Sequence, residues 1–582
     1  MRGRGLGSSS GWLLPLLLGL LVSLPALGGG LLLDDLFYLL AVERGAEGRD
    51  PVPFGLYDFT RGEESAERWR DLSYAPWWTS EDFSLRFFRP LSSLLLSADL
   101  KFFKEHLWVA HLHSIAWFLA LVSVVISLHR RLADARTARL ASVIYALAIA
   151  HLAPTGWLSA RHTLVAAVFG LLALDLHLRG REGKNGARLA RLAAPVLVAL
   201  SMLCSELSLA ALAFIFSYEL FGRADPLRRR ILALAPYTVL AGAYLIFYVA
   251  AGYGARGTGL YVSPVTEPAH FLAAALVRVP ILLGELVATT PAMISATRPA
   301  DQPAFAVWGA IAALIAASAL LALWRRIGPG ERRALRWLLP GALVSLLPGA
   351  SGVLGGRALL PALVASSLLV ALFIRRGVAS ARQRAQSPAG RAVLWAVVTA
   401  LILTHIVLAP AFRVGVTILW GKLSSETERI AATAPDCGPR YVLLAAADPT
   451  VVTYVKVIML FDRSIERFRV VSPAANDHRL EEVTATGFDL VVVGERGPNF
   501  WERVHRNEPL RAGDVVSLSD MRLEVLEAAP SGPTRIRVDL GRPLGDPELC
   551  LLVWRGGKLE RLDPPAPGEV LELPHEPGPM GL

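Results

Sequence analysis

The sequence predicts a polytopic α-helical membrane protein that ends in a soluble, strand-rich domain. Three observations carry this prediction. Of the 582 residues, 53% are hydrophobic and only 19% are charged, and the mean hydropathy is +0.46. Apolar runs of about 20 residues, the length that crosses a bilayer, recur along the first two thirds of the chain. After about residue 411 they give way to short apolar segments bounded by Gly, Pro and Asp.

The net charge of +10 does not indicate a nucleic-acid partner. The basic residues form short clusters between apolar runs, as in the cytoplasmic loops of membrane proteins. They form no basic stripe interleaved with aromatic residues. The three cysteines, Cys204, Cys437 and Cys550, are too few for a disulfide scaffold or a cysteine-based metal site.

The N-terminal segment has two interpretations. Residues 1–30 have the basic start, apolar centre and small-residue end of a signal peptide. The apolar run continues to Leu33, which favours an uncleaved first span with a cytoplasmic N-terminus. In both cases the next segment, 34–105, is a long loop outside the cytoplasm. Its aromatic residues, among them Trp77 and Trp78, predict helices that lie along the outer membrane surface.

Ten further spans are expected before residue 412. They lie at about 107–128, in a hairpin over 138–178, in a pair over 192–222, and at about 231–251, 304–324, 337–351, 358–374 and 392–411. The segment 270–295 carries Arg278 and Glu285. If it also crossed, the basic cluster over 325–336 would lie outside, against the positive-inside bias. We therefore expect this segment to lie in the interface or to re-enter the membrane.

This topology gives about eleven spans in a membrane domain over 1–411 and puts the domain over 412–582 outside the cytoplasm. The expected location is a bacterial inner membrane. Strands are predicted at 440–445, 468–472, 488–494, 516–518, 523–526 and 535–540, which indicates a small α+β or mostly β fold with no evident catalytic constellation. Cys437 and Cys550 could pair on this oxidising side, and two free thiols are an equal alternative.

Unusual polar residues near the span ends all fall on the outer face of this topology. They are Asp34, Asp35, Arg89, His106, His113, His151, Arg161, Glu206 and Arg357. Taken singly, an interfacial Arg or His can simply extend to the lipid headgroups. Taken together, ionisable residues at one membrane face are candidates for function. Carboxylates combined with arginines predict a site that activates a hydroxyl and holds a phosphate.

Several short motifs carry a family resemblance. They are the adjacent Asp34 and Asp35, Phe88-Arg89-Pro90-Leu91 followed by Ala98-Asp99, His106 and His113, the turn from His151 through Trp157 to Arg161, Cys204-Ser205-Glu206, and Gly356-Arg357 with Pro361. In this order they resemble GT-C glycosyltransferases, particularly the bacterial and transmembrane tetratricopeptide O-mannosyltransferase-like branch. The resemblance covers most of residues 10–411.

The resemblance implies a GT-C-like fold and a polyprenyl-phosphate-linked sugar as donor, used from the outer leaflet with inversion. Asp34 or Asp35 would be the base that takes the proton of the acceptor hydroxyl. The lipid phosphate would be held by Arg89, Arg161 and Arg357. The four remaining candidates, His106, His113, His151 and Glu206, would orient these groups, and at least two of the four are expected to serve in packing. No cofactor is required, although two aspartates and several histidines are compatible with a divalent metal.

The chain also departs from the family. A second His and a Glu are missing from the turn at 151, Ser205 stands where the family has Lys, and the tetratricopeptide tail is replaced by strands. The sugar therefore stays open, as does the acceptor, which could be a protein, a lipid or a polysaccharide. An altered or lost activity is an alternative.

Two other classes of protein compete with this interpretation. A multi-pass transporter or lipid flippase would place charges or broken helices near the bilayer midplane and show inverted halves. Neither feature is visible in the sequence. A non-enzymatic membrane assembly or sensor protein, with the outer domain as its active part, is the third class.

Overall fold

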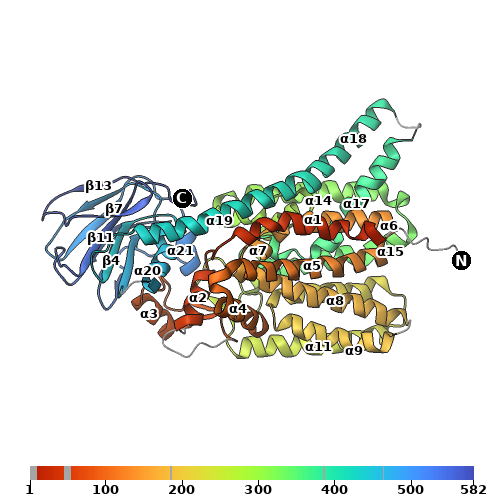
Figure 1. Ribbon diagram of the computed structural model, residues 1–582, viewed down its shortest axis with the longest axis horizontal. Coiled ribbons are helices and arrows are strands. Elements are labelled where there is room, and N and C mark those ends of the chain that lie inside the picture. Colours follow the sequence, from red (N-terminus) through yellow and green to blue (C-terminus); the bar gives the residue numbers. More distant parts are fainter. Residues whose placement is uncertain (1–8, 45–53, 184–185, 384–386, 463–464, 582) are drawn as a thin grey trace.

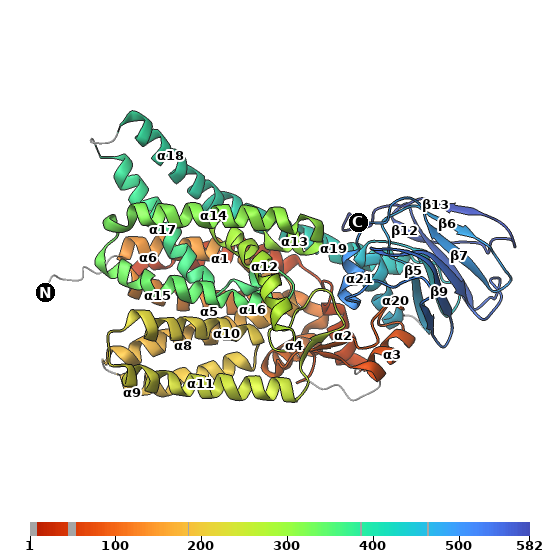
Figure 2. The same ribbon diagram turned by 180° about the vertical axis from the view of Figure 1, so that it is seen from behind.

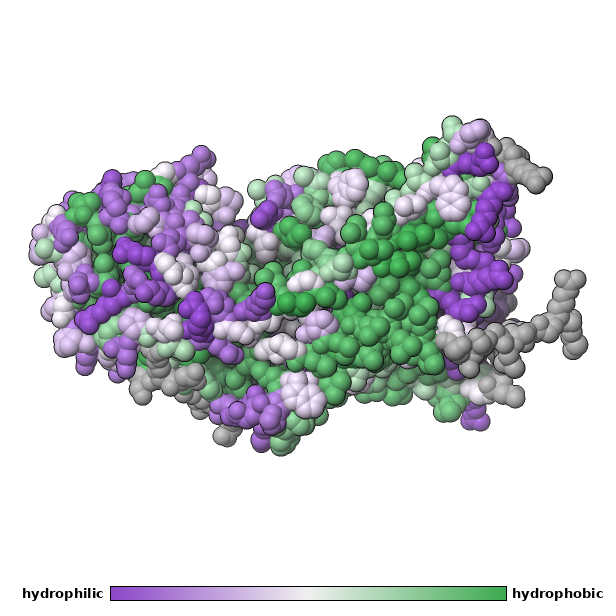
Figure 3. All heavy atoms as spheres, turned by 45° about the horizontal axis from the view of Figure 1, so that its top comes forward, coloured by the Kyte–Doolittle hydropathy of each residue, from purple (hydrophilic) through white to green (hydrophobic). Residues whose placement is uncertain are grey.

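A bundle of helices carries a strand-rich domain at one end, and the helices α2, α3, α20 and α21 lie between the two (Figures 1 and 2). The computed structural model describes residues 9–44, 54–183, 186–383, 387–462 and 465–581. Figure 3 shows a broad hydrophobic surface over the bundle, between the hydrophilic domain and a hydrophilic fringe at the opposite end. We call these the domain end and the basic end. The basic end holds Arg131, Arg179, Arg181, Arg326 and Arg376.

The described residues contain seven helices that are long and apolar enough to cross a membrane. They are Pro90–Leu132, Leu158–Glu182, Leu227–Ala250, Pro268–Ala288, Pro299–Arg326, Ala362–Ala381 and Pro388–Thr433. An eighth span results if Ala135–Leu147 and Ile149–Gly156, which are bent by 45° at their junction, are counted as one. A polytopic helical membrane protein is therefore supported, whereas the expected number of eleven spans is not confirmed.

The shortfall comes from predicted spans that fold as shorter helices. These are α1 (Leu14–Ser23), α9 (Ala187–Met202), α10 (Leu209–Ser217) and α15 (Pro329–Ser345). In α15, Leu335 and Leu338 are fully buried inside the bundle. An apolar segment can be covered by neighbouring helices as well as by lipid, so hydropathy alone does not fix the number of spans in a large bundle.

The segment 270–295, which the sequence predicts to lie in the interface or to re-enter the membrane, is well defined in the structure. It is mostly one continuous helix, α12 (Pro268–Ala288), which packs against α14 (Gln302–Leu323). Gly309 makes the close approach possible, because a Cβ there would lie 1.9 Å from the carbonyl oxygen of Pro280. The length and composition of α12 are those of a span.

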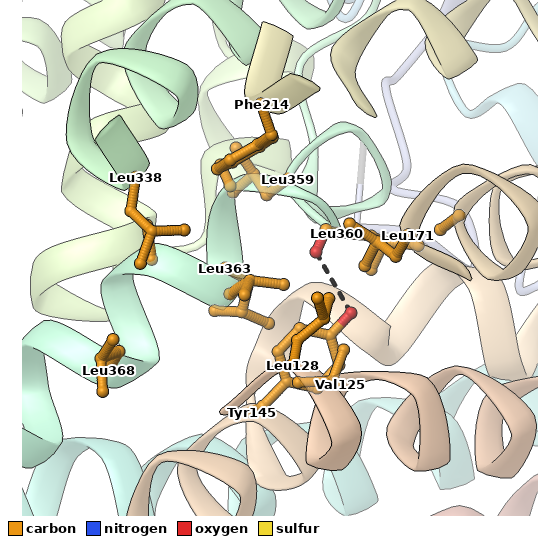
Figure 4. Close-up of a cluster of buried hydrophobic side chains, with 14 of the residues drawn as sticks. Val125, Leu128, Tyr145, Leu171, Phe214, Leu338, Leu359, Leu360, Leu363 and Leu368 are labelled. Carbon is orange, nitrogen blue, oxygen red and sulfur yellow. Dashed lines mark hydrogen bonds between the residues drawn. The ribbon is translucent and has the colours of Figure 1, made fainter. Parts of the chain in front are cut away.

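The core of the bundle supports the turn that carries Arg357. Leucine side chains from α5 (Leu107–Leu132), α8 (His162–Glu182), α15 and α17 (Ala362–Ala381) form one buried cluster that includes Tyr145 of α6 (Ala135–Leu147) (Figure 4). The Tyr145 hydroxyl donates a hydrogen bond of 3.1 Å to the carbonyl oxygen of Leu360. This bond fixes the chain three residues after Arg357.

The last helix leaves the bundle and enters the domain. It begins as α18 (Pro388–Ile402), passes through a π-helical segment (Leu403–Leu408) and continues as α19 (Ala409–Thr433) (Figure 1). The predicted boundary between 411 and 412 falls within this helix. The first strand of the domain, β4, begins at Arg440.

Two sheets form the domain. The six-stranded antiparallel sheet has the order β13 (Leu571–Leu573), β6 (His478–Glu481), β7 (Gly487–Val492), β10 (Gly532–Asp539), β9 (Arg522–Ala529) and β8 (Val515–Ser517). The four-stranded sheet has the order β12 (Lys558–Arg561), β11 (Leu549–Arg555), β4 (Arg440–Ala445) and β5 (Arg467–Ser472), with β11, β4 and β5 parallel. A disulfide joins Cys437, just before β4, to Cys550 of β11.

Part of the loop after the first helix, which the sequence predicts to form helices along the membrane surface, packs into this domain. It contains β1 (Asp58–Arg61), α3 (Glu63–Asp71) and β2 (Ser84–Arg86), and β3 (Gly254–Arg256) of a later loop completes its sheet. Trp77 and Trp78 lie in the hydrophobic core of the domain, and the Trp77 indole donates to the carbonyl oxygen of Val471 at 2.9 Å. Tryptophan prefers membrane interfaces and protein cores alike, so the sequence pattern alone does not separate the two positions.

Candidate functional site

Asp35 is fully buried, and both of its carboxylate oxygens are occupied by backbone amides. It opens α2 (Asp35–Arg44). Its Oδ2 accepts from the amide of Leu32 at 3.1 Å, and its Oδ1 accepts from the amide of Ser159 at 2.8 Å. Burial raises the pKa of Asp35 to about 7, although these two amides act in the opposite direction. Asp35 therefore ties the chain after the first helix to the turn η6 (Leu158–Arg161).

Asp34 is half-buried and keeps one oxygen free. Its Oδ1 accepts a hydrogen bond of 3.2 Å from the hydroxyl of Tyr454, which belongs to the strand-rich domain. Its Oδ2 has no hydrogen-bond partner within the part of the chain that the structure describes. Burial raises the pKa of the Asp34 carboxyl, while the charge of Arg357 and the Tyr454 hydroxyl lower it. Asp34, unlike Asp35, can accept a further proton donor.

Arg357 is the second group without a committed partner. It lies on the short turn η11 (Gly356–Ala358) at the domain end, half-buried, with its guanidinium 5.6 Å from the ring centroid of Trp157. It makes no hydrogen bond or ion pair with any described residue. The turn is pressed against the bundle, since a Cβ on Gly356 would lie 2.4 Å from the Cα of Ala150. A fixed backbone thus presents an unpaired guanidinium near Asp34.

Arg89 is fully engaged by Glu206 and its neighbours. Its Nε donates to Oε2 of Glu206 at 2.9 Å, and its Nη2 pairs with the other carboxylate oxygen. Its Nη1 lies 3.1 Å from Nε2 of His162, and the rings of Phe87 and Tyr57 flank the guanidinium at 4.4 and 4.8 Å. Burial alone would raise the pKa of Glu206, but the Arg89 charge outweighs it, so that this pKa is lowered. The pair is ionised and mutually satisfied.

Arg161 belongs to a second buried group. Its Nη1 pairs with Asp99 and lies 2.8 Å from Nδ1 of His113. His113 also contacts Asp99 at 3.0 Å and accepts at Nε2 from the Trp117 indole at 2.9 Å. Arg161 follows Ser159 by two residues, so this group is continuous with the segment that anchors Asp35.

Two of the predicted residues lie outside these groups. His151 is buried between Phe118 and Tyr145, with ring centroids 4.7 and 4.9 Å away, and its Nε2 lies 2.9 Å from the Tyr145 carbonyl oxygen. His151 thus has the environment of a packing residue. His106 is exposed on the short turn η4 (Lys104–His106) and makes none of the contacts described above.

Three tyrosines of the site did not emerge from the sequence. Tyr57 donates to the carbonyl oxygen of Ser159 at 2.9 Å. Tyr261 is surrounded by the charges of Arg357, Arg89, Asp34 and Glu206, and burial raises its pKa. Tyr454 contacts Asp34 from 420 residues further along the chain. Tyrosines carry no charge or motif signal, so only their position reveals them.

Outside the undescribed segments, no three His, Cys, Asp or Glu side chains gather in a way that could hold a metal ion. The arrangement that does occur is a carboxylate with one free oxygen beside an unpaired guanidinium. Such a pair can accept a proton from a hydroxyl and bind an anionic oxygen.

Comparisons with known proteins give only distant similarities. No protein-family model matches the chain, and no curated protein matches its sequence. Among solved structures, ArnT from Cupriavidus metallidurans bound to undecaprenyl phosphate is 15% identical, with a TM-score of 0.40, over 80% of this chain and 90% of its own. The Archaeoglobus fulgidus oligosaccharyltransferase tethered with an acceptor peptide is 13% identical, with a TM-score of 0.41, over 80% of this chain and 64% of its own.

A third similar structure is the same archaeal oligosaccharyltransferase, AglB, in complex with an inhibitory peptide and a dolichol-phosphate. It is 14% identical, with a TM-score of 0.41, over 78% of this chain and 64% of its own. The present chain thus spans less than two thirds of the oligosaccharyltransferase. TM-scores this low carry no argument about function, which has to come from the side chains.

Proposed function

We propose that this protein is a membrane glycosyltransferase that moves a sugar from a polyprenyl-phosphate donor to an acceptor hydroxyl, with inversion at the sugar. The observation that carries the proposal is the meeting of Asp34, with a free oxygen, and the unpaired Arg357 at the domain end of the bundle. The motifs that resemble GT-C glycosyltransferases, including the O-mannosyltransferase-like branch, support the same reaction.

The proposed reaction is one displacement. The acceptor hydroxyl gives its proton to Oδ2 of Asp34, while its oxygen forms a bond to the anomeric carbon. The bond between that carbon and the phosphate oxygen breaks on the opposite side, which inverts the configuration. The departing polyprenyl phosphate gains negative charge, and the guanidinium of Arg357 stabilises it. The products are the glycosylated acceptor and polyprenyl phosphate, and Asp34 returns its proton to water.

Asp34 fits the role of base better than Asp35. Both oxygens of Asp35 already accept backbone N–H groups, so a substrate hydroxyl would have to displace one of them. Burial raises the pKa of Asp34 and thereby strengthens it as a base. We therefore assign the proton transfer to Asp34 and the positioning of the surrounding turn to Asp35.

The three predicted phosphate-binding arginines differ in availability. Arg357 needs to break no ion pair to bind a phosphate, whereas Arg89 and Arg161 would first have to release Glu206 and Asp99. We propose that Arg357 holds the phosphate in the transition state. Arg89 with Glu206, and Arg161 with His113, would keep the surrounding turns in place.

We further propose that the strand-rich domain lies outside the cytoplasm of a bacterial cell, with the N-terminus inside. The disulfide between Cys437 and Cys550 favours this side, because disulfides persist in oxidising compartments. The acceptor would then be an extracytoplasmic protein, lipid or polysaccharide. Guanidinium groups supply the positive charge in this proposal, so that the reaction requires no cofactor. Chelation tests whether a divalent metal also takes part.

The experiment is a transfer assay on the full-length protein in proteoliposomes, with undecaprenyl-phosphate mannose and other undecaprenyl-phosphate hexoses as donors. Asp34→Asn should lower transfer by about 10²- to 10⁴-fold, because the base is lost. Asp134→Asn is the matched control at the basic end, where Asp134 accepts from Arg375 at 2.7 Å, and should transfer normally. Normal transfer by Asp34→Asn would contradict the proposal. Movement of intact donor across the bilayer without sugar release would favour a flippase.

A further inference from the structure

The strand-rich domain contributes a side chain to the candidate site. Tyr454 lies on a π-helical segment, η13 (Thr450–Val455), that precedes α20 (Lys456–Asp462). Only 3% of its surface is exposed, and its hydroxyl donates to Oδ1 of Asp34. π-Helical segments occur frequently at functional sites.

Aromatic neighbours on both sides hold the Tyr454 ring. Phe37 of α2 meets it edge-on with a centroid distance of 6.3 Å, and Trp501 of α21 (Phe500–His505) does so at 5.9 Å. Val451 and Val455 of the same segment are fully buried in the domain core. The hydroxyl therefore keeps its position unless the domain itself moves.

Arginines of the domain hold it against two loops of the membrane part. The guanidinium of Arg503 donates to the carbonyl oxygen of Gly259 at 3.1 Å, and that of Arg506 donates to the carbonyl oxygen of Trp78 at 2.8 Å. Arg469, buried, donates to the carbonyl oxygen of Asp71 at 2.8 Å. These bonds reach both the first outer loop and the loop after α11 (Leu227–Ala250).

From this geometry we infer that Tyr454 is a positioning residue for Asp34, which makes the strand-rich domain part of the catalytic unit. The inference rests on the proposed function of Asp34. With Oδ1 occupied by the tyrosine hydroxyl, the other oxygen is directed to the acceptor. A carboxylate without this bond would rotate and present either oxygen, and fewer of its orientations would be productive.

The bond also affects how readily Asp34 loses its proton. The charged and titratable groups that face it are Arg357, Tyr454, Tyr261, Asp35 and Tyr38. Burial raises the pKa of Asp34, and the two influences that lower it are the charge of Arg357 and the hydroxyl of Tyr454. Removing the hydroxyl leaves the carboxylate with Arg357 alone, so that Asp34 would hold its proton to a higher pH.

The test is Tyr454→Phe in the full-length protein, with transfer measured against pH in proteoliposomes loaded with undecaprenyl-phosphate sugar. We expect the acid limb of kcat to move to higher pH, with a loss of about tenfold on that limb, the size of one hydrogen bond to a charged group. The KM for the donor should stay unchanged, since Tyr454 contacts no predicted phosphate-binding residue.

Tyr441→Phe is the matched control. Tyr441 is a fully buried tyrosine of the same domain, and its hydroxyl donates to the carbonyl oxygen of Pro435 at 3.0 Å. Its loss weakens the domain without touching Asp34 and should leave the pH profile in place. A fluorinated tyrosine at position 454, a stronger donor, should move the limb to lower pH. Opposite shifts at one position would not result from a loosened domain.

A measurement without substrate separates this inference from the proposed function. Infrared difference spectra of the purified protein follow the carboxyl band that Asp34→Asn removes. In Tyr454→Phe this band should titrate at higher pH. An unshifted band together with an unshifted pH profile would overturn the positioning role, even if Asp34→Asn abolishes transfer. Normal transfer by Asp34→Asn, with a shifted band in Tyr454→Phe, would refute the proposed base and leave the contact established.

Discussion

At the basic end of the bundle the buried carboxylates are paired with arginines, whereas at the domain end one oxygen of Asp34 and the guanidinium of Arg357 have no hydrogen-bond or ion-pair partner among the described residues. Glu219 pairs with Arg181 at 2.7 Å, Asp175 with Arg179 at 2.7 Å, and Glu331 with Arg376 at 2.9 Å. These three acids are almost fully buried. Two of these ion pairs join helices that are distant in sequence, whereas Asp175 and Arg179 lie one turn apart on α8. All three account for the buried charge without any ligand.

The domain end contains paired and unpaired charged groups side by side. The Arg89–Glu206 ion pair resembles the pairs of the basic end. Arg357 and Oδ2 of Asp34 differ from them, because neither has a hydrogen-bond or ion-pair partner among the described residues. Leaving a half-buried charge unpaired costs free energy that a purely structural site would avoid. The difference between the two ends therefore separates residues that hold the fold from residues that are available to a substrate.

The largest expected effect is a loss of stability at the basic end. Glu219→Gln would leave the buried His177 without its carboxylate and the half-buried Arg181 with Asp225 alone, which should lower the free energy of unfolding by about 3 kcal/mol. Thermal unfolding in detergent measures this loss. Glu267→Gln, at an exposed position, serves as the control and should unfold like the unmodified protein. Equal unfolding of the two variants would remove the structural side of the comparison.

The next effect is on activity at the domain end. Arg357→Gln should reduce kcat/KM for transfer by about 100-fold, as expected for the loss of one charge-stabilising donor. Because Arg357 has no hydrogen-bond or ion-pair partner among the described residues, the unfolding temperature of this variant should change little. Arg376→Gln provides the contrast, since it should unfold more easily and keep its activity per folded molecule. A destabilised Arg357→Gln would mean that both arginines serve the fold.

Asp35→Asn should show a smaller loss, of about 1–2 kcal/mol, because an amide oxygen cannot accept from both Leu32 and Ser159 as two carboxylate oxygens do. The loss should depend on pH. Burial raises the pKa of Asp35 to about 7, above the value of about 4 in the unfolded chain.

The sign of this dependence follows from the raised pKa. The contribution of Asp35 to stability is fully present below pH 4 and is lost as the pH rises through about 7. Replacement by Asn should flatten the fall in unfolding temperature over this range. An unchanged slope between pH 4 and 7 would show that Asp35 does not titrate there.

The smallest expected effect is that of chelation. If guanidinium groups alone hold the phosphate, EDTA should leave the transfer rate unchanged, and added Mg²⁺ or Mn²⁺ should not raise it. A rate that falls with EDTA and returns with one cation would reassign the charge stabilisation at the domain end from Arg357 to a metal.

The sequence indicated the charged residues of the candidate site, but it did not indicate which apolar residues pack against other parts of the protein. Asp34 and Arg357 could be expected to meet, because both lie where an apolar run begins or ends, on one side of the predicted topology. The number of spans could not be derived from hydropathy, since residues such as Leu335 and Leu338 face other helices. The positions of Trp77 and Trp78 depended on the domain fold, which leaves no local pattern in their own segment.

Tyr454 is the clearest case of a site residue that sequence reasoning missed. Its segment from Thr450 to Phe461 is apolar and has the composition of a core helix. What distinguishes Tyr454 is a contact across 420 residues, and such a contact depends on how the whole domain sits on the bundle. Ionisable residues stand out in an apolar sequence, whereas an uncharged tyrosine in an apolar segment does not.

The helix from Pro388 to Thr433 has a mechanical consequence. Its 46 residues run from the basic end to the domain without interruption, and η13, which carries Tyr454, packs against its last part. Since each residue advances an α-helix by about 100°, one alanine inserted into α19 would rotate the attached domain by that angle about the helix axis. The Tyr454 hydroxyl would then move away from Oδ1 of Asp34.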